Sequence, residues 1–275
     1  MHSHAAVRAI AVALLLLVFR TGALAQSIVG VLGITAEIAP IENRLLESRE
    51  VIVKGYMFRV GTLAGRRVVV GRSGAGKVNA AIITTLLISE FNPTAILFSG
   101  MAGAIDPALR QGDVVVGTSV AQHDAGLQAP DGLRRRGLRN PLSGALDPVM
   151  VPAPESLLEV ARRSAHELRL QPIRTSDGDE RTPQIVEGVI VTGDVFLSDP
   201  ARRDALRDAL GATAVEMEGA AVVQTCRQFS VPCLVVRSIT DRADGKATDS
   251  YERFLATASE NAATLVASII GNLKP

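Results

Sequence analysis

Short apolar runs alternate with segments of helical hydrophobic spacing along almost the whole chain. The clearest runs are residues 28–34, 95–99, 185–191 and 233–239, each short and each followed by glycine or a polar residue. The segments between them place apolar residues three and four positions apart, which is typical of amphipathic helices. This alternation predicts an α/β fold, a three-layer αβα sandwich whose central mixed sheet is covered by helices on both faces. Functional side chains are then expected on the loops at the strand ends.

Several local patterns refine this prediction. Helical spacing through Glu37, Ile41, Leu45 and Leu46 indicates that the first strand is followed directly by a helix. Residues 56–71 predict a hairpin that turns at Ala64-Gly65, and residues 100–103 (Gly-Met-Ala-Gly) predict a loop after a buried strand. Residues 123–154 are rich in Gly, Pro and Arg and predict a long ordered excursion from the core.

The first 25 residues have the pattern of a signal peptide. Arg8 precedes an apolar run over residues 9–19, and Ala23-Leu24-Ala25 provides the small residues of a cleavage site. The run is shorter than the ~20 residues that cross a bilayer, so we expect no stable membrane insertion after processing, with an uncleaved anchor as the alternative. Residues 26–275 then form one domain of an exported, periplasmic protein.

Charge and cysteine content narrow the kinds of partner. The 29 Lys and Arg residues balance the 28 Asp and Glu residues, so nothing favours nucleic acid, and a small molecule is the expected partner. Cys226 and Cys233 are the only cysteines, and their places in a helical and a strand pattern predict two buried free thiols. No Cys/His set has zinc-ligand spacing, so neither a metal nor another cofactor is expected.

Three acidic residues stand where packing alone does not explain them. Glu37 follows the first strand, Glu218 begins a helix, and Asp241 follows the last apolar strand. Each alone also fits an ordinary helix-start or turn acid. At strand ends of one sheet, however, the three carboxylates can converge on one crevice.

The sequence around these acids resembles the nucleoside phosphorylase/nucleosidase superfamily, and within it the methylthioadenosine/S-adenosylhomocysteine nucleosidases. The resemblance is carried by the segments Val215-Glu216-Met217-Glu218 and Val236-Arg237-Ser238-Ile239-Thr240-Asp241, supported by residues 73–78, 99–103, 123–125 and 191–196. It implies a nucleoside phosphorylase-like fold, hydrolysis of a purine nucleoside to free base and a ribose derivative without a metal, and a homodimer.

The resemblance also implies a role for each matching residue. Asp241 matches the acid that shares a proton with the purine, oriented by Thr240, where the family usually has Ser. Glu218 matches the residue that binds the ribose hydroxyls, and Glu37 matches the base that positions water. The other residues implied in substrate binding are Met101, Ala102, Gly103, Phe196, Leu197, Glu216, Met217 and Arg237. Met217 and Phe196 also fit plain core packing, and Arg237 also fits a structural ion pair.

Two departures from the family pattern lie near the expected water. The first strand is followed by one acid, Glu37, where the family has consecutive acids, and Met101 stands where the nucleosidases often have Ser. Two alternatives therefore stay open beside hydrolysis. One is a phosphate-dependent nucleoside phosphorylase, and the other is an exported nucleoside-binding protein without turnover.

Overall fold

The computed structural model describes residues 27–174 and 180–274, so the predicted signal peptide lies outside the described residues. The large sheet contains β1 (Ile28–Gly33), β2 (Leu46–Val53), β3 (Tyr56–Leu63), β4 (Arg66–Arg72), β5 (Ala95–Ala104), β6 (Val114–Gln122), β9 (Val151–Pro152), β12 (Ile185–Thr192), β13 (Ala212–Glu216) and β14 (Cys233–Asp241). The helices are α2 (Thr35–Glu42), α3 (Lys77–Phe91), α4 (Glu155–Glu167), α5 (Pro200–Leu210), α6 (Gly219–Gln228) and α7 (Ala247–Asn272). Two small sheets pair β7 (Gly126–Ala129) with β8 (Gly132–Arg135), and β10 (Ile173–Arg174) with β11 (Glu180–Arg181).

The central sheet is mixed, as predicted. Its order is β13-β12-β6-β14-β5-β1-β4-β3-β2, with β9 added beside β6. The pairs of β1 with β4 and β5, of β5 with β14, and of β12 with β6 and β13 are parallel, whereas β14 runs antiparallel to β6. The end of β13 also pairs with β5, where Val215 lies opposite Gly103. Strands β5, β14, β6, β12 and β13 therefore close into a ring that brings their ends together.

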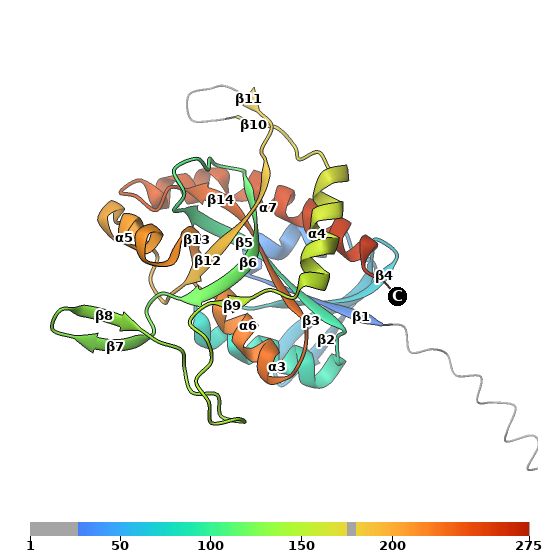
Figure 1. Ribbon diagram of the computed structural model, residues 1–275. Helices are drawn as coiled ribbons and strands as arrows, with labels where there is room; N and C mark the ends of the chain where they lie inside the picture. The colour runs from blue at the N-terminus through green and yellow to red at the C-terminus, as the bar shows by residue number, and fades with distance from the viewer. Residues whose placement is uncertain (1–26, 175–179, 275) are drawn as a thin grey trace, which may run out of the picture.

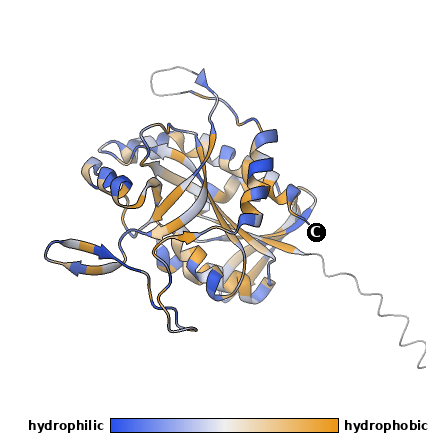
Figure 2. Cartoon of the chain, viewed as in Figure 1, coloured by the Kyte–Doolittle hydropathy of each residue, from blue (hydrophilic) through white to orange (hydrophobic). Residues whose placement is uncertain are grey.

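Helices cover both faces of this sheet, which confirms the three-layer sandwich (Figure 1). One apolar core cluster joins α3 and α6 to the sheet, and a second joins α2, α4 and α7 to the opposite face. Figure 2 shows the apolar colour concentrated on the strands inside, with polar colour on the outer sides of the helices. Helix α7 is long and apolar enough to cross a membrane by composition, but 56% of its most apolar window is buried in the protein, as in a core helix.

The first helix is shorter than the spacing of Leu45 and Leu46 predicts. Helix α2 ends at Glu42, and Leu46 begins the edge strand β2, which pairs antiparallel with β3. Most β2 side chains are exposed, so this strand lacks the alternating apolar pattern that reveals a half-buried strand. The predicted hairpin is present as β3 and β4, and β2 extends it by one strand.

The glycine-rich segment 100–103 is strand, not the loop that we predicted. Strand β5 continues to Ala104 because its backbone is paired with β14 along one edge and with β13 at its end. Glycine in a strand interior weakens the strand, and here pairing with β14 along the segment and with β13 at Gly103 compensates for it. The segment therefore lies inside the sheet and presents its side chains to the site described below.

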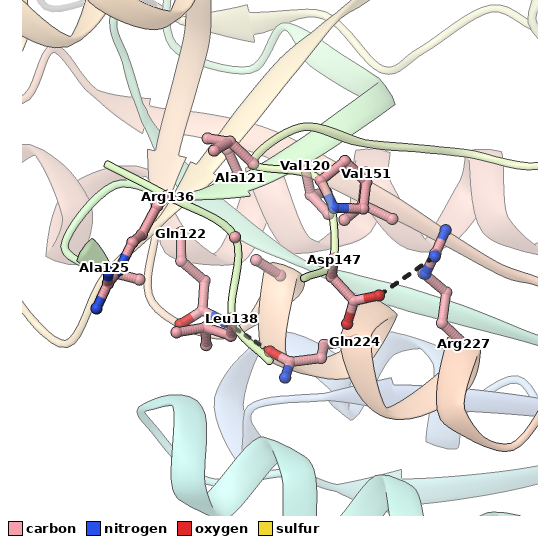
Figure 3. A pocket seen from close by; sticks show the side chains of 14 residues that line it. Val120, Ala121, Gln122, Ala125, Arg136, Leu138, Asp147, Val151, Gln224 and Arg227 are labelled. Carbon is pink, nitrogen blue, oxygen red and sulfur yellow. Dashed lines mark hydrogen bonds and ion pairs between the residues drawn. The ribbon is translucent and has the colours of Figure 1, made fainter. Parts of the chain in front are cut away.

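The excursion 123–154 is an arm that begins and ends on the core (Figure 1). Its first part is the β7–β8 hairpin, and its last part is β9, which pairs with β6. Figure 3 shows how the arm and the end of β6 are tied to α6: Asp147 of the arm lies 3.4 Å from Arg227, and Gln122 at the end of β6 donates to Gln224 at 2.7 Å. The cavity between them has a volume of only about 30 Å³, which is water-sized.

Cys226 and Cys233 form a disulfide, so the expectation of two free thiols was wrong. Helix α6 ends at Gln228, and Ser230 then adopts a left-handed conformation (φ 58°) that reverses the chain. This reversal places the two Cα atoms 6.2 Å apart, within the range that a disulfide spans. The prediction placed each cysteine in its own element and did not include the tight turn that brings the end of α6 next to the start of β14.

Replacing both cysteines, as Cys226→Ala with Cys233→Ala, should lower the free energy of unfolding by about 2 kcal/mol, because the bridge closes a short loop in the unfolded chain. Urea unfolding of the mature protein measures this change. A reducing agent should lower the urea midpoint of the wild type and leave the double variant unaffected. A wild-type midpoint that does not respond to reduction contradicts the bridge.

Candidate active site

A cavity of about 270 Å³ lies at the carboxyl ends of the central parallel strands. The ends of β5, β13 and β14 form its floor, and the start of α2 and the loop after β12 form its sides. Ligands of open α/β sheets bind at this edge, where the strands end. The cavity is lined by Ile34, Glu37, Ala75, Met101, Ala102, Gly103, Val195, Phe196, Leu197, Val215, Glu216, Met217, Glu218, Thr240, Asp241 and Tyr251.

The three carboxylates singled out in the sequence meet in this cavity. Glu37, Glu218 and Asp241 all line it, and each is 4% exposed or less. They come from α2, from the start of α6 and from the end of β14, and 204 residues separate Glu37 from Asp241 by their numbers (241 less 37). Their convergence is therefore a product of the fold.

Asp241 is held by its immediate neighbours. Its Oδ1 accepts a hydrogen bond from the Ala243 amide at 2.8 Å, and the Thr240 hydroxyl donates to Oδ2 at 2.9 Å. Burial raises the pKa of the Asp241 carboxyl, although these two donors act in the opposite direction. A carboxyl of this kind keeps a proton to higher pH than a surface aspartate and is suited to donating it.

Glu37 is fixed through both carboxylate oxygens. Its Oε2 accepts the Met101 amide at 3.0 Å, and its Oε1 accepts the Tyr251 hydroxyl at 3.0 Å. Burial raises the pKa of Glu37, with the charge of Arg237 as the largest opposing influence. A raised pKa strengthens a carboxylate as a proton acceptor near neutral pH.

Arg237 lies beneath the cavity and carries the positive charge of the cluster. It is 1% exposed, its Nε donates to Glu216 at 3.2 Å, and its Nη2 lies 3.8 Å from Glu218. Its guanidinium also stacks 4.0 Å from the ring centroid of Phe98. Within the described part of the chain its Nη1 has no hydrogen-bond partner. Arg237 thus forms a buried ion pair and also keeps one donor free.

Glu216 anchors the start of helix α6. Its carboxylate accepts the backbone amides of Glu218 at 3.1 Å and of Gly219 at 2.7 Å, in addition to Arg237 and the Thr192 hydroxyl. Negative charge is favourable at a helix N-terminus. The Glu216 carboxylate is therefore saturated by internal partners, although the residue lines the cavity.

Glu218 has fewer hydrogen-bond partners than Glu216, and its pKa depends on the charges around it. Its Oε1 accepts the Gly76 amide at 2.7 Å. Burial and then the neighbouring Glu216 raise the pKa of Glu218 to about 8, against the lowering influence of Arg237. This carboxyl therefore exchanges its proton near neutral pH in the ligand-free protein.

Two glycines of β5 make room for these charged side chains. A Cβ on Gly100 would lie 2.5 Å from both Arg237 Nη1 and Glu37 Oε2, and one on Gly103 would lie 2.7 Å from Asp241 Oδ1. Real Cβ atoms do not approach other atoms so closely. Because Gly100 has no Cβ, Arg237 Nη1 and Glu37 Oε2 can both lie against the same position of the β5 backbone.

A second set of contacts holds the loop after β12 at the cavity mouth. Lys77 Nζ donates to Asp124 at 2.8 Å, and the backbone amides of Lys77 and Asp194 donate to Asp194 and Asp124 at 2.8 and 3.0 Å. These bonds join the start of α3 to the loops that follow β6 and β12. They position the next residues of this loop, Phe196 and Leu197, on the cavity wall.

The comparisons with known proteins agree with this geometry. The family model described as the phosphorylase superfamily matches residues 27–271. The chain belongs to the phosphorylase superfamily.

Curated relatives and solved structures place it more closely, in the methylthioadenosine/S-adenosylhomocysteine nucleosidase branch of that superfamily. The 5′-methylthioadenosine/S-adenosylhomocysteine nucleosidase of Psychromonas ingrahamii is 35% identical over 89% of this chain and 99% of its own length. The structure of the Neisseria meningitidis nucleosidase in complex with methylthio-immucillin-A has a TM-score of 0.75 and 33% identity, covering 90% of this chain and all of that one. A futalosine hydrolase of Helicobacter pylori matches with a TM-score of 0.75 and 32% identity, covering 90% of this chain and 98% of that one.

The structure of this superfamily member brings together nearly all the residues that the sequence singled out. Every one of them lines the cavity except Arg237, which lies just beneath it. Sequence reasoning missed Tyr251, Ile34, Ala75, Val195 and Val215. Tyr251 is the most consequential omission, because its hydroxyl reaches Glu37 from a helix that begins six residues after Asp241. Among the described residues, no group of three or more His, Cys, Asp or Glu is arranged to hold a metal ion.

Replacing Glu218 by Gln should change how stability depends on pH. The pKa of Glu218 rises from 4.5 to about 8 on folding, so between these pH values the native state holds the proton more tightly than the unfolded state. Its contribution to stability is complete below pH 4.5 and is lost as the pH rises through 8. Relative to Glu218→Gln, the wild type should therefore lose free energy of unfolding across this range. Urea unfolding at several pH values measures the difference, with the exposed Glu90→Gln as control; parallel curves for wild type and Glu218→Gln contradict it.

Proposed function

We propose that this protein hydrolyses the N-glycosidic bond of methylthioadenosine, S-adenosylhomocysteine or a related purine nucleoside, releasing the free base and a ribose derivative. The observation that carries the proposal is the convergence of Glu37, Glu218 and Asp241 on one cavity of about 270 Å³, near the lower end of the range for small-molecule pockets. The relatives named as nucleosidases support the same reaction.

Asp241 is the proposed acid for the leaving base. As the bond between the sugar and the purine breaks, its electron pair moves into the base, which is a better leaving group once a proton reaches a ring nitrogen. Burial raises the pKa of Asp241, which favours the protonated form that this transfer needs, and Thr240 orients the carboxyl. Phe196 and Leu197 form the wall that the base would contact.

Glu218 is the proposed contact for the ribose hydroxyls. Positive charge develops on the sugar as the bond breaks; this charge favours the ionised form of a carboxyl close to the hydroxyls, and the carboxylate stabilises it in turn. Glu218 keeps acceptor capacity for this role because, among the residues that the structure describes, only the Gly76 amide donates to its carboxylate and Arg237 is 3.8 Å away. Met217 supplies an apolar surface beside it.

Glu37 and Arg237 are the proposed holders of the attacking water. Arg237 Nη1 is a buried donor without a partner among the described residues, and it lies beside Glu37 Oε2 over Gly100. A water molecule bound here would donate one hydrogen bond to the carboxylate and accept one from the guanidinium. Glu37 would then take the proton as the water oxygen bonds to the sugar.

The charge of the cavity favours water over phosphate as the nucleophile. The described residues that line the cavity include no Lys, Arg or His. They include four acidic residues, Glu37, Glu216, Glu218 and Asp241. The nearby guanidinium of Arg237 is already paired with Glu216. The lining therefore offers a phosphate anion no positive side chain, and each carboxylate that is ionised repels it at close range.

Purified mature protein should release free base from a purine nucleoside in phosphate-free buffer, at a rate that added phosphate does not raise. Chromatography of the liberated base measures this for a panel of methylthioadenosine, S-adenosylhomocysteine, adenosine and futalosine. Strict dependence on phosphate would make the protein a phosphorylase. Tight nucleoside binding by calorimetry, together with no release over hours, would make it a binding protein.

Removing either proton-transfer group should abolish most of the turnover. Glu37→Gln and Asp241→Asn keep the shape of the site but lose the base and the acid, so kcat should fall by about 10²–10⁴-fold in each. Steady-state kinetics measures the loss, with the exposed Asp208→Asn on α5 as a control of unchanged activity. Full turnover by Glu37→Gln would remove Glu37 from the mechanism.

We also propose that residues 1–25 direct export to the periplasm and that two copies form a homodimer. The Cys226–Cys233 disulfide supports export, since such bridges persist in oxidising compartments.

Apolar side chains on α3 and the arm support formation of the homodimer, because Val78, Leu142 and Leu146 are 71%, 77% and 58% exposed. Amino-terminal sequencing of the periplasmic fraction and light scattering test these two points, and an unprocessed cytoplasmic chain or a single-copy mass contradicts them.

A further inference from the structure

Tyr251 lies in the early part of α7 and lines the same cavity as Asp241 on β14 and Glu216 on β13. Its side chain lines the cavity, and its hydroxyl donates to Glu37 Oε1 at 3.0 Å across 214 residues of sequence. Helix α7 also packs directly on α2, the helix that carries Glu37. The contact therefore joins two elements that the fold already holds together.

The Glu37 carboxylate has one donor on each oxygen, and the two donors differ in kind. The backbone amide of Met101 fixes Oε2, whereas Tyr251 supplies a side-chain hydroxyl to Oε1. The Met101 side chain has no hydrogen to donate, so within the described residues Tyr251 is the side chain that hydrogen-bonds Glu37. With both oxygens held, the plane of the carboxylate cannot rotate freely.

The Tyr251 ring is itself braced. The Phe196 ring meets it edge-on, with centroids 6.2 Å apart and planes at 84°, an arrangement that aromatic pairs favour. Phe196 belongs to the loop that Lys77, Asp124 and Asp194 hold at the cavity mouth. The direction of the Tyr251 hydroxyl is thus set by packing on one side and by Glu37 on the other.

From this geometry we infer that Tyr251 is a positioning residue for Glu37: the Tyr251 hydroxyl aims the Glu37 carboxylate at the sugar. The inference rests on the proposed function and adds a group that none of the sequence motifs contains. Loss of the hydroxyl leaves the shape of the cavity intact, because the ring still packs on Phe196. It removes one of the two bonds that orient the base.

The ionisation of Glu37 depends on several neighbours besides Tyr251. Arg237 on β14 stabilises the carboxylate, whereas Glu216 at the end of β13 opposes its charge. Glu218 and Asp241 act on the Tyr251 phenol in turn. Because the Tyr251 hydrogen bond lowers the pKa of Glu37 against the raising effect of burial, its loss should raise that pKa further.

Tyr251→Phe in the mature protein tests the inference by kinetics. The base must be ionised, so activity falls as the pH drops through the pKa of Glu37. The acid limb of the kcat/KM profile should therefore shift to higher pH in the variant. At neutral pH kcat should fall by about 10-fold, the usual effect of losing a hydrogen bond to a charged group, while KM stays within about twofold.

Tyr56→Phe is the matched control, because Tyr56 is the only other tyrosine and lies exposed on β3. It should leave kcat and the pH profile unchanged. Wild-type kcat and an unshifted acid limb in Tyr251→Phe would overturn the inference. Thermal unfolding of both variants distinguishes a lost contact from a lost fold.

The absorption of the phenol provides a second, independent readout. The chain contains no tryptophan, so in a Tyr56→Phe background the tyrosine absorption band comes from Tyr251 alone. This band should shift with pH at the same midpoint as the acid limb, since ionisation of Glu37 strengthens the hydrogen bond, and Glu37→Gln should abolish the shift. If the position of the band changes neither with pH nor in Glu37→Gln, the inference is overturned. If the wild type releases no base at all, the proposed function fails, while this spectrum still decides whether Tyr251 and Glu37 are coupled.

Discussion

The site depends on a single buried guanidinium. Arg237 lies among Glu37, Glu216 and Glu218, and stacks on Phe98, with almost no access to solvent. A buried carboxylate is unfavourable by several kcal/mol unless it is partnered, and here one positive charge serves three negative ones. Arg237 makes its close contact with Glu216, so its positive charge mainly stabilises that carboxylate. The remaining carboxylates have less of this compensation, and their burial raises their pKa values.

The lack of compensating positive charge makes the cluster unfavourable for stability, but it also makes the carboxyl groups suitable for proton transfer. A surface carboxylate is fully ionised at neutral pH and is a weak base and no acid. Burial at the strand ends changes this for Glu37 and Asp241 in different surroundings: Glu37 lies within the field of Arg237, whereas Asp241 has only uncharged donors. Two side chains of nearly the same chemistry can therefore act in opposite directions within one cavity.

Architecture explains why these groups meet. The closure of β13 onto β5 draws five strands into a ring, so their carboxyl ends surround a common space. Gly100 and Gly103 then let charged side chains lie against the backbone of β5, where any larger residue would collide. The substrate-facing surface is thus a property of the assembled sheet, and no single segment of the chain contains it.

How far the sequence predicts this structure depends on what each residue contacts. Buried strands and amphipathic helices are predictable because burial imposes apolar runs and periodic spacing. Edge strand β2 was missed because its exposed face leaves no such pattern, and residues 100–103 were misassigned because only their tertiary partners make them strand. The acids Glu37, Glu218 and Asp241 were found from their places at strand ends and from the family motifs. Tyr251 could not be, since nothing local indicates that a helical tyrosine hydrogen-bonds a residue 214 positions away.

The disulfide between α6 and β14 has a consequence for how the chain matures. Cys226 and Cys233 are the only cysteines, so oxidation within one molecule has a single product, and no isomerase has to correct a wrong pairing. The partners are also seven residues apart, and the turn between them forms locally. An oxidant alone is therefore enough to complete the covalent structure, at a stage when the distant strands that build the cavity need not yet have met.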